Sequence, residues 1–272
     1  MNGTRTQARG RPTATRTSTG PGLRKWTLAG LVAGLLPGLL AFAPARWLAQ
    51  ALPAGSGLEI HAPRGTVWQG SGELWLTGGP GSPDRAPLPG RLSWQLSTGP
   101  SGLGLAVAAD CCTPQALRLD LGWQGGGLAL RLADSTSRWP AEALRGLGTP
   151  WNTLEPQGRL DLQTQSLALH LQDGRWRMAG QALLDLNDIS SALSTLQPMG
   201  SYRLALTGGT EPQLALQTLK GDLLLQGQGV WQPKGLSFRG EARAAPGRDE
   251  ALAHILLLIG KREGTRTLFT LG

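Results

Sequence analysis

Histidines, cysteines and paired carboxylates are the side chains that most often bind metals or transfer protons, and here they are few and scattered. His61, His170 and His254 form no metal-binding spacing, and Asp249-Glu250 is the only adjacent acidic pair. The chain also lacks a nucleophile elbow, a phosphate-binding loop with its lysine and a dinucleotide fingerprint. The sequence therefore predicts a non-enzymatic protein with no catalytic residues, no cofactor and no metal.

We interpret the chemistry-bearing residues structurally instead. His170 is expected to be solvated on the polar side of a strand, and His254 to be partly buried in an apolar helix. Cys111 and Cys112 are the only cysteines and are neighbours. Their Cα atoms lie about 3.8 Å apart across a trans peptide, which is shorter than the usual disulfide span. The favoured interpretation is two free, small apolar residues in a loop, and a bridge between them is the alternative.

Short segments with a period of two dominate the chain after Leu52. Leu167, Leu169 and Leu171 alternate with Ala168 and His170, which gives one apolar face. Glycine, proline and small polar residues separate such segments. Strands of about six residues every ten to fifteen positions imply a dozen or more strands if they pair in sequence order. The prediction is a mainly β protein with an extended, curved, meander-like antiparallel sheet.

The aromatic residues recur at a loose interval. The residues Trp68, Trp94, Trp123, Trp151, Trp176, Tyr202 and Trp231 are separated by 26, 29, 28, 25, 26 and 29 residues. Two strands with their turns occupy about that much chain. Trp75 and Trp139 fall outside the series, so a true repeat stays a hypothesis.

Three segments have helical signals. Pro140 is placed to begin a short helix that ends at Gly146 or Gly148. The segment 187–198 offers Asn187 or Asp188 as N-cap and Pro198 as terminator. The segment 248–264 has acidic residues at its start and a possible cap at Gly260, and its apolar run is too short to cross a membrane. We expect this last helix to pack on the apolar face of the sheet, followed by a final strand.

The net charge of +8 lies almost entirely in the N-terminal region. Residues 1–58 contain seven basic residues and no acidic one, whereas the chain from Glu59 onward contains 19 basic and 18 acidic residues. A nearly neutral body lacks the electrostatic footprint that nucleic-acid binding requires, so no nucleic acid is expected as a partner.

An uncharged stretch of about 20 residues follows the basic tail and suffices to cross a bilayer. The sequence predicts three parts: a cytoplasmic tail 1–25, a transmembrane signal anchor 26–45 and an exported β-rich domain 46–272. The positive-inside rule places the N-terminus in the cytoplasm. A cleaved signal peptide and an organelle transit peptide are the alternatives. The predicted anchor residues are Arg24, Lys25, Trp26, Leu31, Leu35, Leu39, Phe42 and Trp47.

Several stretches together resemble one family. They are "GTVWQGSG" (65–72), "LSW" (92–94), "GRLDL" (158–162), "MGSYRLAL" (199–206), "GDLLLQGQGVW" (221–231), "FRGEARA" (238–244) and "LLLIGKREG" (256–264). In this order and spacing they are similar to protein N of the bacterial type II secretion system. The structural motif residues that we single out are Gly65, Trp68, Gly70, Trp94, Gly200, Tyr202, Gly221, Gly227, Gly229, Trp231, Gly240 and Gly260.

The resemblance implies a single-pass protein of the bacterial inner membrane, with its body in the periplasm. Its role would be non-enzymatic assistance to the assembly or stability of the machinery that exports folded proteins. The implied partners are other type II secretion subunits of the inner-membrane platform or of the outer-membrane channel, together with membrane lipid. The alternative hypothesis is a membrane-tethered β groove that binds or transfers lipid, in the style of AsmA-like proteins.

Trp68 and Trp75 are an odd number of residues apart, so in one regular strand they would face opposite sides. We hypothesise that a bulge at Gly70 to Gly72 brings both onto one apolar face.

Overall fold

The computed structural model describes residues 38–53, 55–100, 102–172, 174–232 and 234–272. The chain divides into two compact units, Met1–Phe42 and Ala43–Gly272. Most of the predicted membrane span, with Arg24, Lys25, Trp26, Leu31 and Leu35, lies outside the described residues. No helix in the described ranges combines the length and apolar character that crossing a membrane requires.

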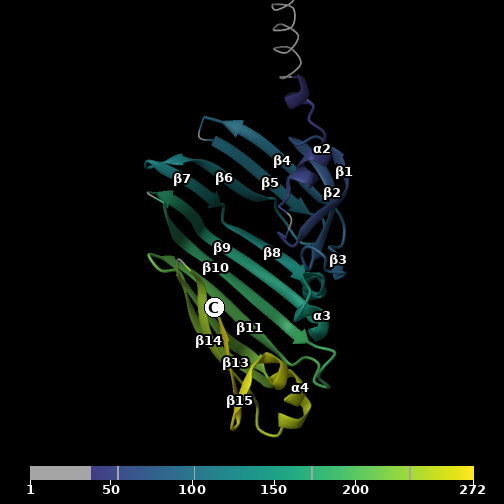
Figure 1. Cartoon of the computed structure of the whole chain (residues 1–272), viewed down its shortest axis with the longest axis vertical. Coiled ribbons are helices and arrows are strands. Elements are labelled where there is room, and N and C mark those ends of the chain that lie inside the picture. Colours follow the sequence, from purple (N-terminus) through teal and green to yellow (C-terminus); the bar gives the residue numbers. More distant parts are fainter. Residues whose placement is uncertain (1–37, 54, 101, 173, 233) are drawn as a thin grey trace, which may run out of the picture. The chain divides into compact units, whose positions relative to one another are not determined.

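In its described residues, the second unit is one 16-stranded antiparallel sheet with four short helices (Figure 1). The strands are β1 (Leu58–Gly65), β2 (Gln69–Thr77), β3 (Arg85–Pro87), β4 (Leu92–Gly99), β5 (Gly102–Ala109), β6 (Leu117–Gln124), β7 (Gly127–Leu132), β8 (Ser135–Pro140), β9 (Gln157–Gln172), β10 (Arg175–Ser190), β11 (Gly200–Gly209), β12 (Gln213–Gly221), β13 (Leu223–Gln232), β14 (Gly235–Ala244), β15 (Lys261–Glu263) and β16 (Arg266–Leu271). The helices are α2 (Ala45–Ala51), the 3-10 helix η1 (Ala141–Leu147), α3 (Trp151–Leu154) and α4 (Asp249–Ile259).

The strands pair almost entirely in sequence order, which confirms the predicted meander. The order is β1-β2-β4-β5-β6-β7-β9-β10-β11-β12-β13-β14-β16-β15, with β3 paired to β2 and β8 paired to β9. β3 continues the line of β4 along β2, because β4 pairs with residues 69–72 of β2 and β3 with residues 75–77. β8 extends the line of β7 along β9 in the same way.

The two ends of the strands differ. At one end, tight turns join β4 to β5, β6 to β7, β9 to β10, β11 to β12 and β13 to β14; we call this end the hairpin rim. The turn between β1 and β2 lies short of this end, because β2 begins opposite Gln95 in the middle of β4. The other end, called the helical end, carries η1, α3, α4 and all the longer connections (Figure 1). The buried core gathers at the helical end, where Leu160, Tyr202 and Leu223 pack with Leu252 and Ile255 of α4.

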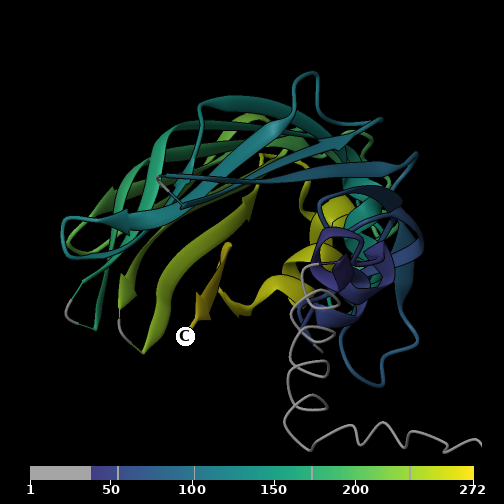
Figure 2. The ribbon, with the colours of Figure 1, turned by 90° about the horizontal axis from the view of Figure 1, so that it is seen from above.

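The sheet is an arch with α4 on its concave side (Figure 2). Register shifts between Ala179 and Gln181 of β10, and between His61 and Arg64 of β1, mark bulges. Bulges increase the local twist of a strand and bend it, which helps so wide a sheet to curl. Cross-strand pairs assign Leu204, Leu216 and Phe238 to the concave face, which we call the inner face; the polar residues between them lie on the outer face.

Two of the three predicted helices form. η1 begins after Pro140, with Gly148 at positive φ at its end, and α4 begins at Asp249 and Glu250. The predicted helix at 187–198 is wrong. Asn187 and Asp188 belong to β10, and residues 191–199 form turns. The Met199 N–H donates to the Ile189 carbonyl, so tertiary pairing of this loop outweighs the local capping signals.

Candidate interaction surfaces

The inner face is apolar along the whole sheet but is covered at one end only. Register places Leu105, Leu121, Leu130 and Leu169 on this face, towards the hairpin rim, and each is half-buried. At the helical end, by contrast, Ala242 and Leu252 are completely buried where α4 packs on β14 and β16. The predicted packing of this helix on the apolar face is therefore confirmed.

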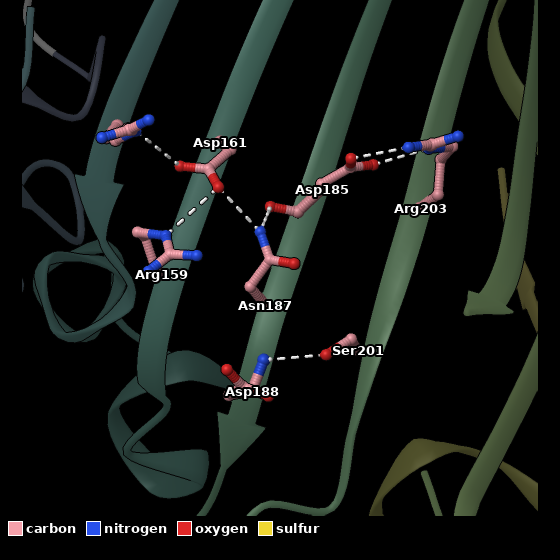
Figure 3. Close-up of polar contacts among 8 residues, drawn as sticks. Arg159, Asp161, Asp185, Asn187, Asp188, Ser201 and Arg203 are labelled. Atoms are coloured by element: carbon pink, nitrogen blue, oxygen red, sulfur yellow. Dashed lines mark hydrogen bonds and ion pairs between the residues drawn. The ribbon is translucent and has the colours of Figure 1, made fainter. Parts of the chain in front are cut away.

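The outer face carries a row of charged residues in one register line, called the charged row. It runs across four strands in the order Arg138, Asp161, Asp185 and Arg203. The two aspartates lie directly opposite each other, which alone would be repulsive. Figure 3 shows Asp185 paired with Arg203 and Asp161 paired with Arg159, while Asn187 donates to the Asp161 carboxylate and to the backbone carbonyl of Asp185.

The bonds within the charged row are short and mutually supporting. Arg203 donates from Nε to Asp185 Oδ1 at 2.6 Å and from a terminal nitrogen to Oδ2 at 2.7 Å. Asp161 Oδ2 accepts from Asn187 Nδ2 at 2.8 Å and from Arg159 Nε at 3.1 Å, and Arg138 Nε lies 3.6 Å from Oδ1 (Figure 3). The hydrogen bonds from Arg203 lower the pKa of Asp185, against the opposing effect of burial. These contacts fix strand register, because Asp161 has partners on β8 and β10 as well as on its own strand, and Asp185 is paired with Arg203 on β11.

The glycines singled out in the sequence are places of close approach or unusual backbone. Gly65 and Gly221 have φ of 86° and 123°, which disfavour any side chain. Phe238 lies against Gly227 and Gly229, the ring of Phe269 against Gly240, Trp94 against Gly70 and the Tyr202 hydroxyl against Gly200. Gly260 is the C-cap residue of α4, as predicted. Its φ of −178° is extended rather than left-handed, and the Leu268 carbonyl takes the space that a side chain there would need.

The aromatic series does not share one environment: Trp68 is half-buried in a turn, Trp151 lies in α3, and the other five are either buried or exposed at the hairpin rim. Trp94 and Tyr202 are buried, and burial raises the pKa of the Tyr202 hydroxyl above its usual range. Trp94 Nε1 donates to the carbonyls of Thr66 and Val67 at 3.2 and 3.1 Å. Trp123, Trp176 and Trp231 are instead exposed at the hairpin rim. A single spacing in sequence therefore produces both core and surface positions.

The proposed bulge at Gly70 to Gly72 is wrong. Residues 69–72 pair regularly with β4, and the bulge lies in β1, between His61 and Arg64. Trp68 is half-buried in the turn between β1 and β2, so it shares no strand with Trp75. The side chains of Trp94 and Ile60 occupy the space that a Cβ at positions 70 and 72 would need, which explains why both are glycine.

Cys111 and Cys112 are joined by a disulfide, so the favoured interpretation as free thiols is wrong. Their Cα atoms are 3.7 Å apart, in the turn that follows β5. Cys112 is buried beside Leu88, Ala109 and Ala143, while Cys111 is exposed. The Arg138 N–H donates to the Cys112 carbonyl at 2.7 Å, which connects this turn to β8.

The histidines are far from forming one site. His61 Nε2 lies 3.0 Å from Glu59 and its ring is 5.0 Å from that of Trp75. His170 is half-buried on the outer face of β9, and His254 is exposed on α4, so its expected burial is wrong. Within the described ranges, no three His, Cys, Asp or Glu residues are grouped as metal ligands.

The remaining anchor residues lie where the described chain begins. Leu39, Phe42 and Trp47 are all exposed, and Trp47 belongs to α2. The helix around Leu39 ends before Phe42, and Ala43 already belongs to the β-rich unit.

Comparison with known families identifies residues 56–268, more than half of the chain, as type II secretion system protein N. No curated protein and no solved structure matches this chain. The matched region spans β1 to β15 completely and includes the meander, the arch and α4. The match favours the secretion hypothesis over the lipid groove, and the family is a component of secretion machinery rather than a known enzyme family. The chain therefore belongs to the protein N family of the type II secretion system.

Proposed function

We propose that this chain is a non-enzymatic subunit of the type II secretion machinery, with its β-rich body in the periplasm. The observation that carries the proposal is the family match over residues 56–268, which covers nearly the whole sheet. The subunit would assist the assembly or stability of the complex that exports folded proteins.

The inner-membrane anchor is part of this proposal and rests on the sequence. Residues 26–45 contain no charge, and Arg24 and Lys25 directly precede them. The positive-inside rule then orients the tail to the cytoplasm. Reporter-enzyme fusions after residue 58 should be active only in the periplasm, and the mature protein should keep its N-terminus. Recovery of a shortened, soluble form would contradict a retained anchor.

The edges of the sheet offer a route to partner subunits. β15 is short, charged and exposed, which discourages indiscriminate pairing. In the described part of the chain, residues 269–271 of β16 pair with β14 alone, and Leu271 is exposed. A strand of the inner-membrane platform or of the outer-membrane channel would add at this edge by main-chain hydrogen bonds.

The test is deletion of the gene, with complementation by the full chain. We expect exoproteins to accumulate in the periplasm and the amounts of other secretion subunits to fall. A photo-crosslinker at Thr270 should capture a secretion subunit, whereas one at Gln217, in the interior of the sheet, serves as the matched control. Normal secretion in the deletion strain would overturn the proposal.

A further inference from the structure

Three tryptophans at the hairpin rim are more exposed than any other described tryptophan. Trp123, at the end of β6, is 75% exposed; Trp176, at the start of β10, is 60% exposed; and Trp231, near the end of β13, is 55% exposed. Exposing so much of the largest apolar side chain is unfavourable in water, and the same feature occurs on three separate hairpins.

The three side chains share one face and one spacing. Their cross-strand partners are Leu128, Leu171 and Leu236, which continue the apolar inner face up to the rim. In the strand order, β6, β10 and β13 are each three strands apart. At about 4.8 Å between neighbouring strands, the tryptophans are separated by roughly 14 Å along the sheet.

This arrangement differs from that of a protein-binding hot spot. Hot-spot residues cluster at the centre of an interface and are surrounded by packed neighbours. Here each tryptophan belongs to its own hairpin, beside exposed polar or basic residues such as Gln124, Arg175, Arg177 and Lys234. Separate indole rings flanked by polar and cationic groups suit the bilayer interface, where the ring contacts the acyl region and the polar groups stay among the headgroups.

We propose that Trp123, Trp176 and Trp231 form a membrane-contact rim that inserts into the interface of a phospholipid bilayer. Three rings on separate hairpins contact a flat, soft surface together, and the rim then fixes the orientation of the sheet to the membrane. This property does not depend on the secretion role, so its test is independent of a secretion assay.

The experiment uses the full-length chain reconstituted into phosphatidylcholine vesicles. The ten tryptophans all emit, so the emission of the rim is obtained by subtracting that of the triple variant Trp123→Gln, Trp176→Gln, Trp231→Gln from that of the wild type. Vesicles with acyl chains brominated near the headgroup quench indoles that reach the interface. We expect the rim emission to be blue-shifted and to fall severalfold in brominated vesicles.

Trp151 provides the matched control, because it lies in α3 at the helical end and is 36% exposed. The emission removed by Trp151→Gln should be the same in both kinds of vesicle. Equal rim emission in both vesicles, or equal quenching of Trp151, would overturn the proposal. A second measurement does not depend on the triple variant and serves if that variant misfolds. Single photo-crosslinkers at positions 123, 176 and 231 should capture phospholipid in cells. Capture of protein alone would exclude the membrane-contact rim.

Discussion

At the scale of single residues, the pair of Asp185 and Arg203 couples strand register to pH. The hydrogen bonds from Arg203 lower the pKa of Asp185 below its ordinary value of 3.8, so the folded protein favours the carboxylate. Stability from this group is present above the unfolded pKa and is lost as pH falls through the folded pKa. We expect Asp185→Asn to lower the free energy of unfolding by about 1 kcal/mol at pH 7, because the pair is partly exposed.

Urea unfolding between pH 2 and 7 measures this effect. The difference between wild type and Asp185→Asn should shrink as pH falls below 3.8 and through the lower pKa of the folded state, where the wild-type carboxylate becomes neutral. Gln217 lies on the same outer face of the sheet, on β12. The variant Gln217→Ala is therefore the control and should show no such pH dependence. A difference that stays constant down to pH 2 would show that the ion pair contributes nothing.

Two effects disfavour a side chain at Gly221, a positive φ and crowding, and Gly235 has only the first of them. The φ of Gly221 is 123°, and a Cβ there would lie 2.3 Å from Gly200 Cα and 2.5 Å from the Met199 carbonyl oxygen. Gly235 has a similar φ of 131° but open space around it. Backbone strain should cost about 1 to 3 kcal/mol in either Ala variant. Crowding should add about 1 to 3 kcal/mol in Gly221→Ala alone. Thermal unfolding of both variants tests this, and equal losses would remove the crowding argument.

At the scale of elements, only one face of the helix α4 packs on the core. Ile255 is 1% exposed, whereas Leu257, two residues along the same helix, is 64% exposed. We expect Ile255→Ala to destabilise the β-rich unit by about 2 to 5 kcal/mol because it leaves a cavity against the inner face. Leu257→Ala should change stability by less than about 0.5 kcal/mol. Chemical denaturation of both variants provides the measurement, and similar losses would mean that α4 does not seal the core.

Local sequence signals located α4 but failed for residues 187–198. The acidic residues at the start of α4 and its apolar run agree with its packing, so propensity and tertiary structure favour the same result. In the second case Asn187 already pairs with Arg159 on β9, and Ile189 is paired to Gly200 on β11. A capping signal is worth about 1 kcal/mol, which several ladder hydrogen bonds readily exceed.

At the scale of the whole molecule, burial is unequal between the two ends of one continuous sheet. The core cluster lies at the helical end, while the hairpin rim carries half-buried leucines and exposed tryptophans. Local opening is easiest where few apolar groups are buried. We therefore expect amide hydrogen exchange to be fastest at the hairpin rim and slowest near Leu160, Leu223 and Ala242. Protection that is uniform along β9 and β10 would contradict this gradient.

The sequence by itself determined the meander and the chemistry-poor character of the chain. A period of two with glycine-rich turns specifies strands and hairpins locally, because neighbouring strands pair with little loop-closure cost. The charge distribution and the scattered histidines were likewise readable without a structure, as was the family resemblance. The predicted membrane anchor and its orientation rest on the sequence alone.

Only the tertiary structure decided which parts of the inner face are covered and which tryptophans are exposed. Trp94 and Trp123 look alike in sequence, but Trp94 packs against Gly70, whereas Trp123 lies at the end of β6 beside the hairpin turn. The position of the β1 bulge, the link between Cys111 and Cys112 and the row from Arg138 to Arg203 likewise depend on neighbours distant in sequence. Periodicity gives each strand two faces, but burial and charge pairing depend on what the rest of the chain places against them.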